Sequence, residues 1–205
     1  MKNARVIRRR KTARGGTTEL LLYSAMQELV ANKGSLEIGD VTKRAGVSVG
    51  APYHHFGSKS ELIAAVVDDF YERYDASIMN AEIEGEHWAT REEKRVRMIV
   101  EYHYSDPLAP IILSQLSRDP IVAQVEARWL SAHVAKGARN IAKGQRDGDL
   151  SASIDPGLAA AMILGGLRQA IVHALARKTV HRRSALAGEL WAFVLAVSGA
   201  HPASD

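Results

Sequence analysis

The sequence predicts an all-α protein of about nine helices. Apolar residues recur at helical spacing along most of the chain, and most of these stretches begin or end at a capping signal. No segment alternates apolar and polar residues as a half-buried strand does. No internal repeat is present, so the pattern favours an ordinary globular protein built from packed amphipathic helices.

Two helices are predicted near the N-terminus. The first is capped by Thr17 or Thr18 and ends just before Gly34. The second runs from about Ile38 to Ala45 and is followed by Gly46. Glycine accepts the left-handed backbone that commonly follows a helix, so the chain is expected to turn there.

A third helix is expected from Ser48, its N-cap candidate, to Phe56, and a longer helix starts at about Lys59 with Ser58 as its cap. Two short helices joined by three or four residues that include glycine form a helix-turn-helix. The second helix of such a unit lies in the major groove of DNA. The stretch from the second helix to Lys59 therefore predicts binding to double-stranded DNA.

The later helices are predicted from caps and apolar runs of the same spacing. The first two, in chain order, are a helix opened by the capping box Thr90–Glu93 and a short apolar segment from Pro107 to about Leu116. They are followed by a long helix from Asp119–Pro120 to Lys143 or Gly144, a helix from Asp155–Pro156 to about Ala176, and a last one from about Ser184 to Ser198.

Residues 158–176 and 185–197 are apolar nearly all the way round. A helix that is apolar on every side is buried on every side. We therefore expect each to pack on its own domain with one face and on a second copy of the chain with the other; the alternative is a hairpin buried within one chain. The residues expected at this homodimer interface are Gly165, Leu167, Ile171, Leu190 and Val194.

Positive charge is concentrated in the first 16 residues. The whole chain has a net charge of +4, yet residues 1–16 carry seven Lys or Arg and no acid, so the remainder is net negative. Such a block is expected to be disordered and to attract phosphates, through Arg8, Arg9, Arg10 and Lys11 in particular. The alternative is a solubilising leader or a cloning remnant.

The composition predicts a soluble, cytoplasmic protein, associated with the nucleoid if it binds DNA. The segment after the basic block is amphipathic and contains acids, unlike a signal peptide. The longest apolar run, residues 158–167, is too short to cross a bilayer. No membrane partner is expected.

The residues expected at DNA lie on the arm, at the start of the first helix and around the third helix. Small residues before and in the third helix allow close approach of the backbone, and the polar side chains supply donors to phosphates. Beyond the arm these residues are Thr17, Ser48, Val49, Gly50, Ala51, Tyr53, His54 and Lys59.

Residues 17–70 resemble the DNA-binding domain of the TetR family of bacterial transcriptional regulators. The family pattern falls on Val41, Ala45, Gly46, Val47, Ser48, Tyr53, His54, His55, Phe56, Lys59, Glu61 and Leu62. The resemblance implies a homodimer on a palindromic operator, more often a repressor than an activator. It also implies a basic arm (1–16), a DNA-binding domain (17–58) and a helical domain (59–205) that dimerises and binds a small effector.

The effector is expected among the central helices, at about residues 80–145. Candidate contacts are aromatic or polar-tipped residues on apolar faces, each of which could instead pack in the core. They are Trp88, Met98, Tyr102, His103, Ile112, Trp129 and His133. The mostly apolar set argues against a highly charged effector.

Nothing in the sequence favours an enzyme, a metal site or a cofactor. There is no cysteine and no His-x-x-x-His, and the one Gly-x-Ser-x-Gly stretch, residues 46–50, lies in the predicted helix-turn-helix. Adjacent His54 and His55 point about 100° apart on a helix, so they rarely share a metal. A second alternative, a protein-interaction module that has lost DNA binding, would require a damaged recognition helix.

Overall fold

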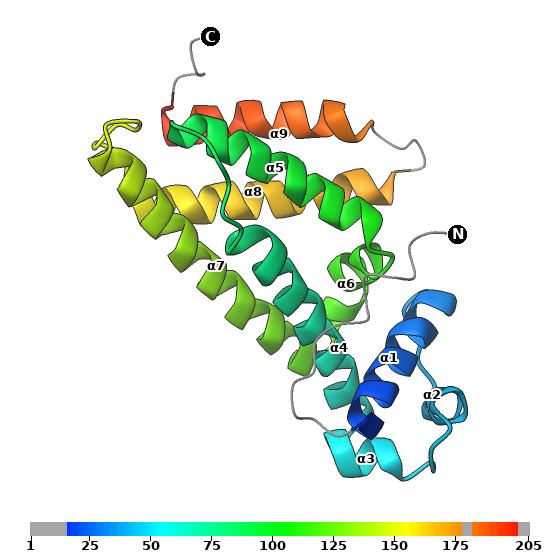
Figure 1. The fold of residues 1–205 in the computed structure, drawn as a ribbon. Helices are drawn as coiled ribbons and strands as arrows, with labels where there is room; N and C mark the ends of the chain where they lie inside the picture. Colours follow the sequence, from blue (N-terminus) through cyan, green and yellow to red (C-terminus); the bar gives the residue numbers. More distant parts are fainter. Residues whose placement is uncertain (1–15, 178–181, 201–205) are drawn as a thin grey trace. The chain divides into compact units, whose positions relative to one another are not determined.

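The computed structural model describes residues 16–177 and 182–200, and these form helices and turns without a β-strand (Figure 1). The all-α prediction is confirmed. The chain divides into two compact units, Met1–Val66 and Val67–Asp205. The division falls inside a helix, whereas the boundary expected from the sequence lies between residues 58 and 59, where that helix begins.

The N-terminal unit contains α1 (Gly16–Ala31), α2 (Ile38–Ala45), α3 (Ala51–Phe56) and the first half of α4 (Lys59–Tyr74). The bounds of α2 and the start of α4 are as predicted. Helix α1 begins at Gly16, so Thr17 and Thr18 lie in its first turn instead of capping it. The unit buries apolar side chains from each helix: Leu21, Leu29, Val41, Pro52 and Leu62.

The C-terminal unit contains α5 (Trp88–Ser105), α6 (Ala109–Ser114), α7 (Pro120–Arg146), α8 (Pro156–Ala176) and α9 (Arg183–Ser198). A π-helical turn, Asp75–Met79, continues α4, and a 3-10 turn, Leu116–Arg118, precedes α7. Helices α8 and α9 run antiparallel, with α7 packed on α8 and α5 packed on α9 (Figure 1).

The two Asp-Pro caps are confirmed. The Asp119 carboxylate accepts a hydrogen bond from the Ile121 N–H at 2.8 Å, and the Asp155 carboxylate accepts one from the Leu158 N–H at 2.6 Å. Because each proline occupies the first helical turn, its missing N–H costs no intrahelical bond.

The predicted capping box at Thr90 is wrong. Helix α5 begins two residues earlier, and the backbone N–H of Trp88 donates to the Asp149 carboxylate at 2.6 Å. This carboxylate comes from a turn 61 residues away along the chain. A tertiary contact therefore replaces the local signal as the cap of α5.

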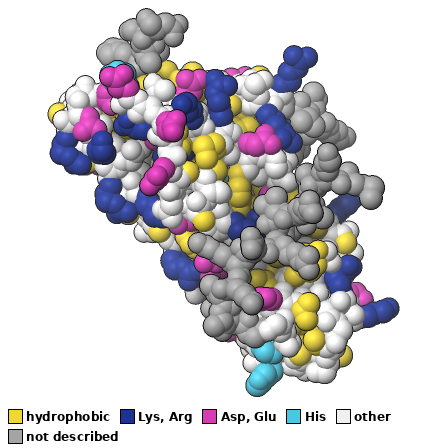
Figure 2. Space-filling view, in the orientation of Figure 1, with side chains coloured by type: hydrophobic (Ala, Val, Ile, Leu, Met, Phe, Trp, Pro, Cys, Tyr) yellow, Lys and Arg dark blue, Asp and Glu magenta, His cyan; other side chains and the backbone are white. Residues whose placement is uncertain are grey.

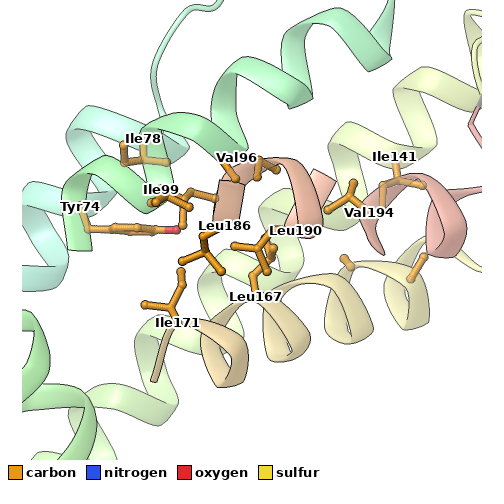
Figure 3. Close-up of a cluster of buried hydrophobic side chains, with 14 of the residues drawn as sticks. Tyr74, Ile78, Val96, Ile99, Ile141, Leu167, Ile171, Leu186, Leu190 and Val194 are labelled. Atoms are coloured by element: carbon orange, nitrogen blue, oxygen red, sulfur yellow. The ribbon is translucent and has the colours of Figure 1, made fainter. Parts of the chain in front are cut away.

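One hydrophobic cluster joins α5, α7, α8 and α9 (Figure 3). It contains Leu167, Ile171, Leu190 and Val194, whose side chains are only 1–4% exposed. These four residues were expected to face a second copy of the chain, and the structure corrects that assignment. Both helices are apolar on all sides, so their sequences did not show which face the chain buries against itself.

The outward faces of α8 and α9 carry other residues. Leu158 and Met162 are 63% and 50% exposed on α8, and Phe193 is 36% exposed on α9. Gly165 on α8 and Gly188 on α9 are exposed as well. An apolar stripe on each helix is therefore left uncovered within one chain.

Helix α8 is long and apolar enough to cross a membrane by length and composition alone, with a mean hydropathy of 1.5. The uninterrupted apolar run of residues 158–167 is only part of this helix, which also contains Arg168, Gln169 and His173. Core helices of soluble proteins pass the same test, so this property is weak grounds for a membrane span.

Candidate nucleic-acid interface and ligand cavity

The turn between α2 and α3 has the backbone expected of a helix-turn-helix. Gly46 follows α2 with φ 68° and ψ 33°, in the left-handed region. The Val47 N–H then donates to the Thr42 carbonyl at 3.1 Å and closes the end of α2. A Cβ at Gly46 would meet no atom within 4 Å, so glycine is needed for the backbone angle alone.

Helix α3 is shorter than predicted. It starts at Ala51, and Gly50 is its N-cap, so Ser48 does not cap it. The Ser48 carbonyl instead accepts the Ala51 N–H at 3.0 Å, which makes residues 48–51 a turn. Pro52 lies in the first helical turn and is buried, which explains how a proline is accommodated in so short a helix.

The predicted DNA-contacting side chains around α3 are at the surface. Val49 is 63% exposed and Tyr53 is 51% exposed. Ser48, Gly50 and His54 are also exposed, and Ala51 is half-buried. Figure 2 shows histidine side chains (cyan) protruding from the surface near α3. The end of the N-terminal unit that carries α3 thus presents both polar and apolar groups.

Contacts that the sequence analysis missed hold α3 and α2 against α1. The Thr18 hydroxyl and the His55 Nδ1 lie 3.0 Å apart, which links α1 to α3. The Arg44 guanidinium contacts the buried Glu28 carboxylate at 2.6 and 2.8 Å, and the Asn32 amide donates to the same carboxylate at 2.8 Å. These bonds hold α2 and α3 in place against α1.

The remaining residues predicted to contact DNA differ in their exposure and in their hydrogen-bond or ion-pair partners. The Ser58 hydroxyl accepts the Glu61 N–H at 3.1 Å, so Ser58 caps α4 as predicted. Lys59 lies 3.4 Å from the Glu37 carboxylate, a pair of exposed groups that stabilises little. Thr17 is half-buried in the first turn of α1. Arg8, Arg9, Arg10 and Lys11 lie outside the described residues.

The C-terminal unit contains a cavity of about 200 Å³ between α5, α7, α8 and α9. Much of its wall is apolar, and the side chains labelled in Figure 3 supply part of it: Val96, Ile99, Ile141, Leu167 and Val194. Mostly apolar cavities with a few polar groups are the usual sites for small molecules.

The polar part of this wall contains paired charges. Arg95 Nε lies 3.0 Å from the Glu92 carboxylate, and the Arg95 guanidinium also donates to the Ile78 carbonyl. Lys136 Nζ lies 2.5 Å from the carboxylate of Asp75, a residue that does not itself line the cavity. Each cation of the wall thus has an acidic partner.

Trp88 is the one predicted effector residue that lines this cavity. Its side chain is 2% exposed, and its indole N–H has no hydrogen-bond partner within the described part of the chain. Met98 and Tyr102 line a second, more open groove of about 550 Å³, which Arg97 and Arg183 also border. Tyr102 donates from its hydroxyl to the Phe70 carbonyl at 2.7 Å.

The other four predicted effector residues pack in the core or at its edge. His103 Nδ1 lies 2.8 Å from the Ile99 carbonyl, and burial lowers the pKa of His103. Ile112 is fully buried. The Trp129 indole donates to Asp68 at 2.7 Å, and burial lowers the pKa of His133. No group of side chains suited to a metal ion occurs in residues 16–177 and 182–200.

Comparison with known proteins agrees with this arrangement. Residues 28–66 match the model of the bacterial regulatory proteins of the tetR family. This segment includes α2, α3 and the turn at Gly46. A search of curated proteins gives no match to the sequence.

Three solved structures illustrate the similarity of the whole chain. The fatty acid degradation regulator FadR from Bacillus halodurans is 18% identical, with a TM-score of 0.75 over 90% of this chain and 97% of that one. A TetR-family transcriptional regulator from Pectobacterium atrosepticum is 23% identical, with a TM-score of 0.70 over 88% and 91%. FadR from Bacillus subtilis in complex with stearoyl-CoA is 19% identical, with a TM-score of 0.66 over 89% and 99%.

The helix-turn-helix match and the shared fold confirm the resemblance seen in the sequence. Residues 28–66 carry the helix-turn-helix segment of the tetR family of bacterial regulatory proteins, and the chain as a whole shares its fold with solved TetR-family structures.

Proposed function

We propose that this protein is a ligand-responsive repressor that binds a palindromic operator as a homodimer. The observation that carries the proposal is the exposed surface of α3 behind a glycine turn, inside the segment that matches the family model. The protein acts in the cytoplasm as a regulator and not as an enzyme.

Helix α3 enters the major groove, with residues at its start facing base edges. Val49 and His54 are placed to read bases, whereas the Tyr53 hydroxyl is placed to donate to a phosphate. Contacts with phosphates position the protein, and contacts with base edges give it specificity.

The second copy of the chain covers the outward stripe of α8 and α9. Leu158, Met162 and Phe193 would leave water on association, which is favourable in proportion to the apolar area buried. Gly165 and Gly188 allow the helices of the two copies to approach closely. This interface replaces the one expected at Leu167, Ile171, Leu190 and Val194, while Gly165 is retained.

The effector binds in the cavity of the C-terminal unit and favours a state with lower affinity for DNA. A ligand changes such an equilibrium only by its differential affinity for the two states, typically about 1–3 kcal/mol. The stearoyl-CoA complex of the Bacillus subtilis relative supports a small-molecule effector in this fold.

The direct test is a gel-shift assay with the DNA upstream of the protein's own gene. We expect a shifted complex in excess competitor DNA, and retention of the protein on heparin until moderate salt. Failure to bind any DNA at low salt would favour the alternative, a protein-interaction module with a recognition helix that no longer reads DNA.

Tyr53→Phe is expected to weaken binding to operator and to random DNA by a similar factor, about 2- to 10-fold for each half-site. The variant removes only a hydroxyl, from a side chain that is half exposed. Affinities for both DNAs can be measured by fluorescence anisotropy. Val49→Ala should instead change the preferred bases. A changed base preference in Tyr53→Phe, with affinity retained, would show that the two roles are assigned wrongly.

Deleting residues 2–14 is expected to flatten the salt dependence of operator binding. Residues 16–66 carry four Lys or Arg and five Asp or Glu, so attraction to phosphates depends on the basic arm. If each arm of the dimer makes roughly two to four phosphate contacts, the slope of log K against log salt should fall by about 4–7.

The experiment is a salt titration of both proteins on one operator. The two affinities should converge at high salt, and the preferred half-site should stay the same. An unchanged slope would identify the arm as a passive leader.

A further inference from the structure

Helix α3 carries two adjacent histidines, His54 and His55, and residues 16–66 contain no other. Histidine is the side chain whose charge ordinarily changes between about pH 5 and pH 8. Residues 16–66 carry four Lys or Arg and five Asp or Glu, which gives a net charge of −1 with both histidines neutral and +1 with both protonated. Protonation of this pair therefore reverses the sign of the charge on the segment that contains the helix-turn-helix.

Both imidazoles are accessible, and His55 is anchored in a way that tolerates either charge state. The two side chains are exposed, and Figure 2 shows histidine side chains (cyan) at the surface near α3. The Nδ1 of His55 lies 3.0 Å from the Thr18 hydroxyl. A hydroxyl donates to a neutral ring nitrogen or accepts from a protonated one, so His55 keeps this bond when it gains a proton. The Nε2 of His55 has no hydrogen-bond partner among the described residues.

Within the described residues, no acid forms an ion pair with either imidazole; the histidines in such pairs are His87 and His133. The two rings meet edge-on with centroids 5.3 Å apart, so two positive charges there repel each other. The charged residues of the helices that adjoin α3 are Glu19 and Glu28 of α1, Asp40, Lys43 and Arg44 of α2, and Lys59 and Glu61 at the start of α4. The Glu61 carboxylate lies beside Gly57, just after α3, yet it is not paired with a histidine. A protonated pair therefore lacks a counter-charge within this part of the chain.

We infer that DNA binding by this protein takes up protons at His54 and His55, so that its affinity for DNA rises as the pH falls through neutrality. Phosphates supply the counter-charge that the pair lacks, and a hydrogen bond from an imidazolium to a phosphate oxygen is stronger than one from a neutral ring. A partner that binds the protonated form more tightly must in turn favour protonation. The inference rests on the proposed function in one respect, that α3 contacts DNA. It adds a signal that acts at the DNA-binding surface, apart from the effector cavity.

Fluorescence anisotropy of the full-length protein on the DNA upstream of its own gene measures the effect, at about pH 6 and about pH 8 and at one ionic strength. We expect about 5- to 50-fold higher affinity at the lower pH, because each subunit of the dimer gains about one proton on binding. The slope of log K against log salt should also be steeper at the lower pH by about 2, since each added phosphate contact contributes about 0.9. A purely structural role of the histidines would leave that slope unchanged.

A variant that carries both His54→Gln and His55→Gln should bind DNA with affinities that agree within about 2-fold at the two pH values. Glutamine keeps a hydrogen-bonding group but does not titrate, and both positions are exposed, so the melting temperature should change little. His87→Gln is the control, because His87 is an exposed histidine of the C-terminal unit that is paired with Asp149. That variant should keep the pH dependence of the wild-type protein.

Isothermal titration calorimetry in two buffers of different ionisation enthalpy counts the protons directly. The wild-type dimer should take up about two protons on binding DNA near pH 7, and the double variant close to none. Because the wild-type measurement needs no substitution, it decides the question even if the double variant fails to fold.

The inference is overturned if the wild-type protein binds DNA equally well at the two pH values, if it takes up no protons, or if the double variant keeps the wild-type ratio of affinities. In each of these cases DNA is still bound, so the proposed function stands. Absence of DNA binding at both pH values would contradict the proposed function together with the inference.

Discussion

Gly165→Arg is expected to convert the proposed dimer into monomers and to lower operator affinity by about 10²- to 10⁴-fold. Gly165 is exposed on α8, and a Cβ there would meet no atom within 4 Å, so a single chain accommodates the longer side chain. In a dimer joined through α8 and α9, two arginines would be buried close together. The affinity falls because the two recognition helices are no longer linked.

Sedimentation velocity at micromolar concentration measures this change. Gly39→Arg is the control, because Gly39 is also an exposed helical glycine with open space around its Cβ. That variant should remain a dimer. Since arginine favours a helix more than glycine does, neither variant should lose stability in its own helix. A dimeric Gly165→Arg protein would show that the outward stripe of α8 is not the interface.

Gly46→Val is expected to abolish specific DNA binding while the dimer remains intact. The left-handed backbone at φ 68° costs an L-residue about 1–2 kcal/mol, and more when its side chain is β-branched. There is no steric clash to relieve, so the strain is released by a change of the backbone. Such a change alters the orientation of α3 relative to α2.

The measurements are an operator titration and sedimentation of the same sample. Gly39→Val is the matched control, because Gly39 lies in the first turn of α2, has open space around its Cβ and lacks the positive φ of Gly46. Valine favours a helix more than glycine does, so that variant should keep both its stability and its affinity for operator. Wild-type affinity in Gly46→Val would contradict the assignment of the helix-turn-helix.

Elements fixed by neighbouring residues could be predicted from the sequence. The bounds of α2, the turn at Gly46 and the caps at Asp119 and Asp155 depend on contacts within a few residues, and the structure confirms all of them. The start of α5 depends on Asp149, which is far away along the chain, so the local capping box at Thr90 was misleading.

The candidate ligand site was predicted less well. Charged residues on amphipathic helices usually face solvent, so Glu92, Arg95 and Lys136 gave no sign that they border a cavity. Buried aromatic residues such as His103 and Trp129 fill the core and bond within it. Trp88 differs from these residues in that it lines the cavity, and this follows from how α5, α7, α8 and α9 pack together, which no local sequence signal shows.

Selection of bound sequences from a random DNA pool, with the full-length protein, tests the central claim most directly. The account predicts enrichment of an inverted repeat whose half-sites are centred about 10 base pairs apart, or a multiple of that distance. Two α3 helices of a symmetric dimer would then lie in major grooves on one side of the duplex. Enrichment of a single unpaired site, or no enrichment at all, would contradict a dimeric helix-turn-helix regulator.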